Sequence, residues 1–336
     1  MKSIIGFAFI VWLAQTGSAP AGRGTLWRQE SKIAVAAADA SDNRQRIDAL
    51  LKLYSDFPEN SRVIRNLAWA EQRAGNSEDA AHCLKTYAGM GMTLPLAGPI
   101  YAAMASSGVL ANLPELDKNR SPITSGRKIF ELPDSDLIAE NIAFDAQSRR
   151  YLVTSAREKK IVSCDDMGKC KDVVVSSPAA ELDGMLAIHV DAKRNLLWAT
   201  TAGMTMQLGF RPERKSKSAL LKFDLRTFRL LKRYEPDDGK EHALGDMTVA
   251  SNGDAYVADG LSGDIYIVKN EGEKLEPLVP AGVFVSPQTP TLNKTETALY
   301  VPDYDEGIAV IELATGKIKW LKTTSPIALD AIDGLY

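Results

Sequence analysis

The sequence predicts a multidomain protein in which an α-helical region precedes an all-β region. Residues 25–110 are rich in Ala, Leu and charged side chains, with apolar residues at helical spacing. From residue 128 onward, short apolar runs alternate with turns rich in Asp, Gly and Asn, which is typical of strands. The length of 336 residues allows two or three domains, and we expect residues 111–127 to link the two regions.

The composition limits the partners of the protein. It is 45% apolar and 25% charged, as in globular proteins, and 40 basic against 43 acidic side chains give a net charge of −3. No run of Lys or Arg forms a stripe that would follow phosphates, so we expect no nucleic-acid partner. Three Cys and three His make a Cys/His zinc site hard to assemble, so a metal would be held mainly by oxygen.

Residues 1–21 predict a signal peptide and therefore an exported protein. Lys2 is followed by the apolar run 4–14, which is shorter than the roughly 20 residues that span a bilayer. The Ala-Pro-Ala at 19–21 is a cleavage pattern that would free the chain at Gly22. We expect a periplasmic or secreted protein with no membrane span after cleavage, and an uncleaved N-terminal anchor is the alternative.

Export changes the expectation for the cysteines, because disulfides persist in oxidising compartments. Cys164 and Cys170 flank a turn-rich insert and would face each other across a hairpin. We expect them to form a disulfide that pins a local turn. Cys83 is left unpaired in a helical stretch, where a buried structural thiol is preferred over a reactive nucleophile.

The helical region has a repeat pattern. We expect helices at 26–38, 43–56, 62–74, 77–87 and 99–104. A 34-residue unit that starts at Ser61 places Leu67-Ala68 in its first helix, Ala80, Leu84 and Tyr87 in the core of its second helix, and Pro58 at the close of the preceding unit. In these positions residues 27–110 resemble two degenerate tetratricopeptide repeats and part of a third. The alternative is a plain helical bundle packed on the next domain, since three repeats are normally needed for a stable stack.

The all-β region repeats one unit, in which an apolar strand, an aromatic-centred strand and further strands are separated by turns. The central aromatic residues Tyr151, Trp198, Tyr256 and Tyr300 follow one another at intervals of 47, 58 and 44 residues. Such a period belongs to the four-stranded blades of a β-propeller. An additional strand at 128–132 and an opening strand at 332–336 would make about four and a half blades. We therefore expect an open ring from a fragment of a propeller.

Four segments of the all-β region carry a resemblance to a known family. They are Glu140 with the run 142–145, the run 253–259, the run 299–303 and Asp333-Gly334-Leu335. Through them residues 130–336 resemble the senescence marker protein/gluconolactonase family, which is related in architecture to paraoxonases and strictosidine synthase-like proteins. The resemblance implies a propeller that has six blades at full length and hydrolyses lactones or esters.

The resemblance also implies a metal site at the channel mouth, where the beginnings of the first strands of different blades converge. In that family a Glu, two Asn and an Asp hold one divalent cation, and the Asp doubles as the general base. Glu140 matches the family's Glu, and Asp333 matches its Asp. Gln288 stands in the place of one Asn. Gly245 stands in the place of the other Asn, and Asp246 lies beside it. Oxygen ligands of this kind suit Ca²⁺ or Mg²⁺. The alternative is that these are turn and channel residues of a propeller without metal.

Two histidines lie near the predicted channel. His189 falls in a first strand and could bind substrate there, although a hydrogen-bonded core histidine is the alternative. His242 follows the acidic run 237–241, so we expect it in a solvated loop.

Three functions are compatible with these patterns. The first is an exported, metal-dependent lactone or ester hydrolase, with a helical domain that docks it to a protein partner. The second is a non-catalytic propeller that binds a ligand or a protein at its channel mouth. The third is an electron-transfer or sensor module.

Overall fold

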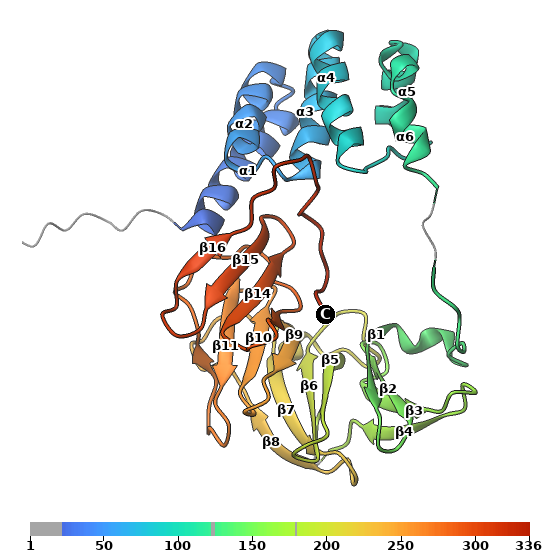
Figure 1. Cartoon of the computed structure of the whole chain (residues 1–336), viewed down its shortest axis with the longest axis vertical. Coiled ribbons are helices and arrows are strands. Elements are labelled where there is room, and N and C mark those ends of the chain that lie inside the picture. The colour runs from blue at the N-terminus through green and yellow to red at the C-terminus, as the bar shows by residue number, and fades with distance from the viewer. Residues whose placement is uncertain (1–21, 122–124, 179) are drawn as a thin grey trace, which may run out of the picture.

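The computed structural model describes residues 22–121, 125–178 and 180–336, so the predicted signal peptide lies outside the described residues. N-terminal helices lie above four separate β-sheets that form an arc, and the C-terminus lies inside this arc (Figure 1). None of the described helices is long and apolar enough to cross a membrane.

The α-helices confirm the predicted helical elements to within about three residues at each end. They are α1 (Arg23–Asp39), α2 (Asn43–Asp56), α3 (Ser61–Ala74), α4 (Ser77–Gly89), α5 (Pro99–Ser106) and α6 (Pro114–Lys118), with short 3₁₀ helices at Val109–Asn112, Ser135–Leu137 and Pro212–Arg214. Helix α6 was not predicted and lies within the expected linker 111–127. It forms because Pro114 suits the first helical position and Glu115 and Asp117 favour the first turn.

Local sequence explains how the helices begin, end and pack. Asp42 accepts a hydrogen bond from the backbone N–H of Gln45 at the start of α2, and Asn60 accepts one from Val63 at the start of α3. The residues expected in the cores of the repeat unit are buried: Leu67, Ala68, Ala80, Leu84 and Tyr87. The resemblance to tetratricopeptide repeats stays a prediction.

Each of the four sheets is an antiparallel meander of four strands. The first sheet contains β1 (Ala139–Asp145), β2 (Arg150–Ser155), β3 (Lys160–Cys164) and β4 (Cys170–Val175), and the second contains β5 (Gly184–Asp191), β6 (Leu196–Ala202), β7 (Ser218–Asp224) and β8 (Leu230–Tyr234). The third contains β9 (Leu244–Val249), β10 (Ala255–Asp259), β11 (Asp264–Val268) and β12 (Glu276–Pro277), and the fourth contains β13 (Thr291–Leu292), β14 (Ala298–Asp303), β15 (Gly307–Glu312) and β16 (Ile318–Trp320). As predicted, the four aromatic residues lie on the second strands β2, β6, β10 and β14.

Apolar layers between neighbouring sheets make this arrangement a partial β-propeller. Leu152 and Ile188 belong to the layer between the first and second sheets, and Trp198 and Val257 to the next layer. The first strands β1, β5 and β9 are neighbours, and they therefore line the channel. Among the described residues, no strand pairing joins the first sheet to the fourth, so the arc is open.

The two additional strands that we expected at the ends of the propeller are not formed. Residues 128–132 make no strand, and their side chains Phe130 and Leu132 instead pack against Val153 and Val162 on the first sheet. Residues 332–336 contribute only an isolated bridge between Gly334 and Thr289. The apolar pattern correctly predicts packing on the sheet, but a strand also needs an edge to pair with, and the described region has four sheets rather than four and a half blades.

The helices are fastened to the fourth sheet and to the C-terminal segment (residues 321–336). The backbone N–H of Gly24 donates to Val283 O (3.2 Å), and the Arg28 guanidinium donates to Phe284 O (3.0 Å). A Cβ on Gly24 would lie 2.8 Å from the Phe284 backbone, so this close approach requires glycine. Beside it, Arg23 Nε lies 3.7 Å from Glu306 Oε1, and the Glu306 side chain is fully buried.

Asp330 of the C-terminal segment closes the same interface. Its buried carboxylate accepts hydrogen bonds from the backbone N–H of Ser61 (2.8 Å), from Ser61 Oγ (3.1 Å) and from Arg62 Nε (3.2 Å). These donors lie at the first turn of α3, where helix N–H groups have no intrahelical partner. The C-terminal segment thus caps a helix that lies 269 residues earlier in the chain.

Candidate functional site

Three predicted site residues, Glu140, Asp246 and Asp333, come close enough for their charges to interact, and we call this cluster the acidic mouth. Glu140 lies near the beginning of β1, Asp246 near the beginning of β9 and Asp333 in the C-terminal segment. Burial, with the charges of Asp333 and Glu140, raises the pKa of Asp246 to about 6. Burial and the charge of Asp333 also raise the pKa of Glu140. The acidic mouth therefore holds a carboxyl group that exchanges its proton near neutral pH.

Thr289 connects Asp246 to the C-terminal segment. Its hydroxyl donates to Asp246 Oδ1 (2.6 Å), and this hydrogen bond opposes the rise in the pKa of Asp246. The Thr289 backbone N–H donates to Asp333 O (3.5 Å), and Leu335 N–H donates to Thr289 O (3.4 Å). Sequence reasoning missed Thr289, although its place directly after Gln288 could have marked it.

Gln288 does not join this cluster. Its side-chain amide donates to Ser286 O (3.1 Å) and Ser286 Oγ (3.0 Å). Among the described residues, no three His, Cys, Asp or Glu side chains are grouped closely enough to hold a metal ion. In this geometry the predicted ligands do not form a cation cage, and we derive no chemical step through a metal.

His189 lies apart from the acidic mouth. It is half-buried near the end of β5, whereas Glu140 and Asp246 lie near the beginnings of the neighbouring strands β1 and β9. Burial lowers its pKa, opposed by the charge of Asp191. It lines a channel cavity of about 380 Å³ together with Thr289, so a substrate-binding role stays a prediction.

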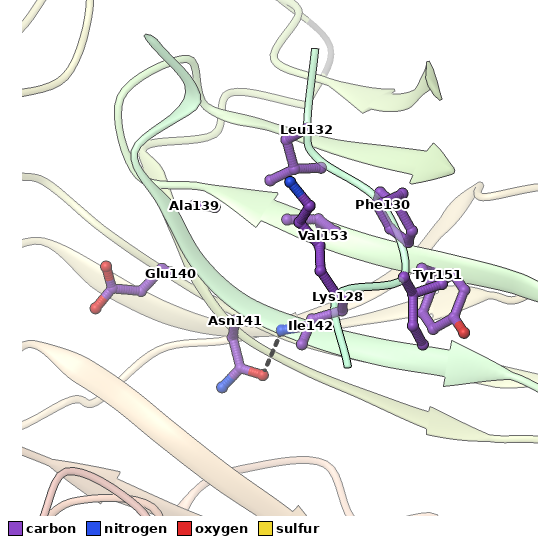
Figure 2. Close-up of a pocket in the computed structure, with 10 residues that line it drawn as sticks. Lys128, Phe130, Leu132, Ala139, Glu140, Asn141, Ile142, Tyr151 and Val153 are labelled. Carbon is purple, nitrogen blue, oxygen red and sulfur yellow. Dashed lines mark hydrogen bonds between the residues drawn. The ribbon is translucent and has the colours of Figure 1, made fainter. Parts of the chain in front are cut away.

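A second cavity, of about 410 Å³, lies between residues 128–132 and the first sheet (Figure 2). Phe130, Tyr151 and Val153 gather on one side of β1 in this view, while the Glu140 carboxylate points away from them. The lining of this cavity is therefore mainly apolar, and Glu140 is the residue that it shares with the acidic mouth.

As expected, Cys164 and Cys170 are bonded and Cys83 is free, but Cys83 is half-buried rather than buried. Cys164 and Cys170 form a disulfide between the paired ends of β3 and β4, with their Cα atoms 4.0 Å apart. Cys83 is free on α4, and burial raises the pKa of its thiol to about 11. At neutral pH this thiol is protonated and therefore a poor nucleophile.

The expectation that His242 lies in a solvated loop was wrong. It is only 4% exposed, and its two ring nitrogens face the carboxylates of Asp259 and Asp238 at 2.7 Å each. A local sequence pattern cannot pair His242 with Asp259, which follows it 17 positions later.

Comparisons with known proteins add only distant structural similarity. No family model matches the sequence, and no curated protein matches it. A streptogramin B lyase structure has a TM-score of 0.42 and 19% identity, with 57% of this chain and 58% of that chain covered. A nidogen/laminin complex has a TM-score of 0.44 and 16% identity, covering 59% and 68%.

A third solved structure is a catalytically inactive virginiamycin B lyase from Staphylococcus aureus with quinupristin, at a TM-score of 0.44 and 16% identity. The alignment covers 59% of this chain and 60% of that chain, so the chain spans about three fifths of the length of the lyases that it matches. Similarity at this level says nothing about activity. The propeller assignment rests on the four sheets themselves.

Proposed function

We propose that the protein is an exported hydrolase of lactones or esters, of the kind that the gluconolactonase resemblance implies, and that Asp246 is its proton-transferring group. The observation that carries this proposal is the place of Asp246 near the beginning of the channel strand β9, hydrogen-bonded to Thr289 (2.6 Å), where burial and the other two carboxylates of the acidic mouth raise its pKa to about 6. A carboxyl group with a pKa near the working pH is ionised often enough to accept a proton and acidic enough to return it.

The reaction needs one water molecule and one transferred proton. Thr289 occupies Asp246 Oδ1, which leaves Oδ2 to accept a proton from water. The water oxygen bonds to the carbonyl carbon of the lactone, the ring C–O bond breaks, and Asp246 returns the proton to the departing ring oxygen. The product is the open hydroxy acid.

Asp333 and a divalent cation are further parts of the proposal. The family resemblance gives Asp333 the role of general base; we assign that role to Asp246 because its pKa is raised, in part by the charge of Asp333. Ca²⁺ or Mg²⁺ is the cofactor that the resemblance implies, and carboxylates are the ligands they prefer. Gln288 would have to leave Ser286 to complete the family's ligand set.

Two coarser features of the molecule support export and a larger propeller. The disulfide between Cys164 and Cys170 is expected in an oxidising compartment such as the periplasm or the extracellular space. Ile142 and Phe144 on β1 are about half exposed, and a neighbouring blade of a six-bladed ring would cover them.

A panel of lactones and aryl esters tests the hydrolase. We expect turnover that rises with pH through an apparent pKa near 6, and a loss of about 100-fold or more in Asp246→Asn. Asp48→Asn, a substitution on α2 far from the acidic mouth, is the matched control and should leave turnover unchanged. Calorimetric titration with Ca²⁺ and Mg²⁺, repeated on Asp333→Asn and Gln288→Ala, tests the cation. Turnover that is unaffected by Asp246→Asn contradicts the proposal.

A non-catalytic binding propeller is the second candidate, because the Gln288 amide is engaged with Ser286 and, among the described residues, the predicted ligands form no cage. It predicts saturable binding of lactones at the channel without release of acid, and equal binding by wild type and Asp246→Asn. The helical region would then serve a protein partner.

A further inference from the structure

The pocket around His242 lies where the loop before β7 meets the loop before β9. Its volume is about 350 Å³, and its charged lining residues are Arg214, Lys217, Lys240, His242, Glu235 and Asp237. Four of these side chains are basic and two are acidic. The pocket belongs to the second and third sheets, and it shares no lining residue with the acidic mouth.

Asp259 fixes the orientation of His242. The Asp259 side chain is fully buried, and its Oδ1 accepts hydrogen bonds from the backbone N–H groups of Ala243, Leu261 and Ser262, at 3.0 Å each. Its Oδ2 lies 2.7 Å from His242 Nδ1. The imidazole is therefore held by a buried partner at Nδ1, which leaves Nε2 for a second partner.

Asp238 occupies the position in front of this nitrogen. Its Oδ1 lies 2.7 Å from His242 Nε2 and accepts a hydrogen bond from the Lys240 backbone N–H (3.0 Å), while its Oδ2 lies 3.0 Å from Lys240 Nζ. These donors lower the pKa of Asp238, with the Lys240 N–H as the largest cause. An ionised carboxylate only accepts hydrogen bonds, so each ring nitrogen of His242 faces an acceptor.

His242 is held more firmly in the structure than Asp238, the carboxylate that it contacts. His242 is buried, but the Asp238 side chain is 34% exposed and sits in an exposed loop whose Gly239 has a left-handed φ of 74°. Rotation of the exposed Asp238 side chain would take its carboxylate away while His242 and Lys240 stayed in place. The vacated position would offer three charge-assisted or backbone donors to any other carboxylate of similar size.

We propose that this pocket binds a small carboxylate ligand, and that Asp238 occupies the carboxylate position when the ligand is absent. Lys217 and Arg214 lie on the same lining, and Arg214 is already paired with Asp183. Lys217 is thus the side chain that can contact a second polar group of the ligand. Ligand binding and the internal Asp238 carboxylate compete for one set of donors.

Competition gives a test with a matched control, because Asp237 lines the pocket and is adjacent in sequence to Asp238, whose carboxylate contacts the lining residues His242 and Lys240. Both Asp238→Ala and Asp237→Ala remove one negative charge. Only Asp238→Ala also removes the carboxylate that contacts His242 and Lys240, so their donors become available to a ligand. With succinate as the probe in calorimetry, we expect Asp238→Ala to bind about tenfold tighter than wild type, and Asp237→Ala to differ from wild type by much less. Lys240→Ala should weaken binding in the Asp238→Ala background.

A second measurement on the wild-type protein tests the proposal even if a substitution disturbs the loop that carries Asp237 and Asp238. The chain has three histidines, so the imidazole nitrogens of His242 can be followed by NMR in the wild-type protein. Excess succinate should shift the Nε2 signal of His242 and leave Nδ1 nearly unchanged, because Asp259 remains bound. Equal succinate affinity in Asp237→Ala and Asp238→Ala, or no shift at His242 in the folded protein, overturns the proposal. Inorganic phosphate that binds as tightly as succinate overturns the choice of a carboxylate ligand.

Discussion

Asp246 shows how neighbouring side chains set the chemistry of one residue. Burial and the charge of Asp333 favour its protonated form, and the Thr289 hydroxyl favours its ionised form. We expected Asp246 near the beginning of a first strand, and it lies there in β9. Its bond to Thr289 could not be predicted, because the two residues are 43 positions apart in the sequence.

Two substitutions that remove interactions of opposite effect should shift the pKa of Asp246 in opposite directions. Asp333→Asn removes a repelling charge and should lower it, whereas Thr289→Val removes the stabilising hydrogen bond and should raise it. Carboxyl-carbon NMR titration of the two variants measures both shifts from the wild-type value near 6. Shifts of the same sign in both variants contradict this account.

The strands illustrate what local sequence determines and what it does not. The aromatic-centred strands were predicted because their alternation and turns are local properties. The run 128–132 has the same pattern but forms no strand, since pairing depends on an available edge elsewhere in the molecule. His242 was misplaced for a related reason: its burial depends on Asp259, which belongs to another strand.

The hairpin of β3 and β4 should depend only modestly on its disulfide. Cys164 and Cys170 enclose a short loop, for which loop entropy contributes at most about 3 kcal/mol to the free energy of unfolding. We expect the double substitution to Ser to increase hydrogen exchange in β3 and β4 alone. Urea unfolding with hydrogen-exchange mass spectrometry measures both effects, and faster exchange throughout the arc would show that the bond supports the whole propeller.

At the scale of the whole molecule, the helices and the propeller share buried polar groups. Asp330 caps α3 from the C-terminal segment, and Arg62 also donates to the Tyr304 carbonyl at the end of β14. These contacts could not be predicted, because no local pattern relates an aspartate near the C-terminus to a helix near the N-terminus.

Removing a buried helix cap should lower the free energy of unfolding more than removing an exposed one. Asp42→Ala removes an exposed cap of α2 and should cost about 1 kcal/mol of unfolding free energy. Asp330→Ala leaves Ser61 and Arg62 without their acceptor in a buried interface and should cost about 3 kcal/mol. Chemical denaturation of both variants gives the comparison, and equal losses would mean that the interface tolerates the loss of the Asp330 carboxylate.

Glu306 makes the same interface sensitive to pH. Burial, and to a lesser degree the charge of Asp303, raises its pKa to about 9, although Arg23 opposes this rise. Because the folded pKa lies above the ordinary value of 4.5, the folded state holds this proton more tightly, and the resulting stability is lost as pH rises from about 4.5 toward 9. Glu306→Gln should remove this dependence. Unfolding curves at several pH values measure it, and parallel slopes for wild type and variant would exclude Glu306 as its source.

The contacts of Asp330 with α3 also have a consequence for the order of folding during synthesis. Helix α3 leaves the ribosome early, yet its buried acceptor follows 269 residues later. The sheets can form one after another from local contacts, whereas the helices must wait undocked until nearly all of these residues have been made. Synthesis of residues 330–333 therefore completes the acidic mouth and the attachment of the first helices in the same step.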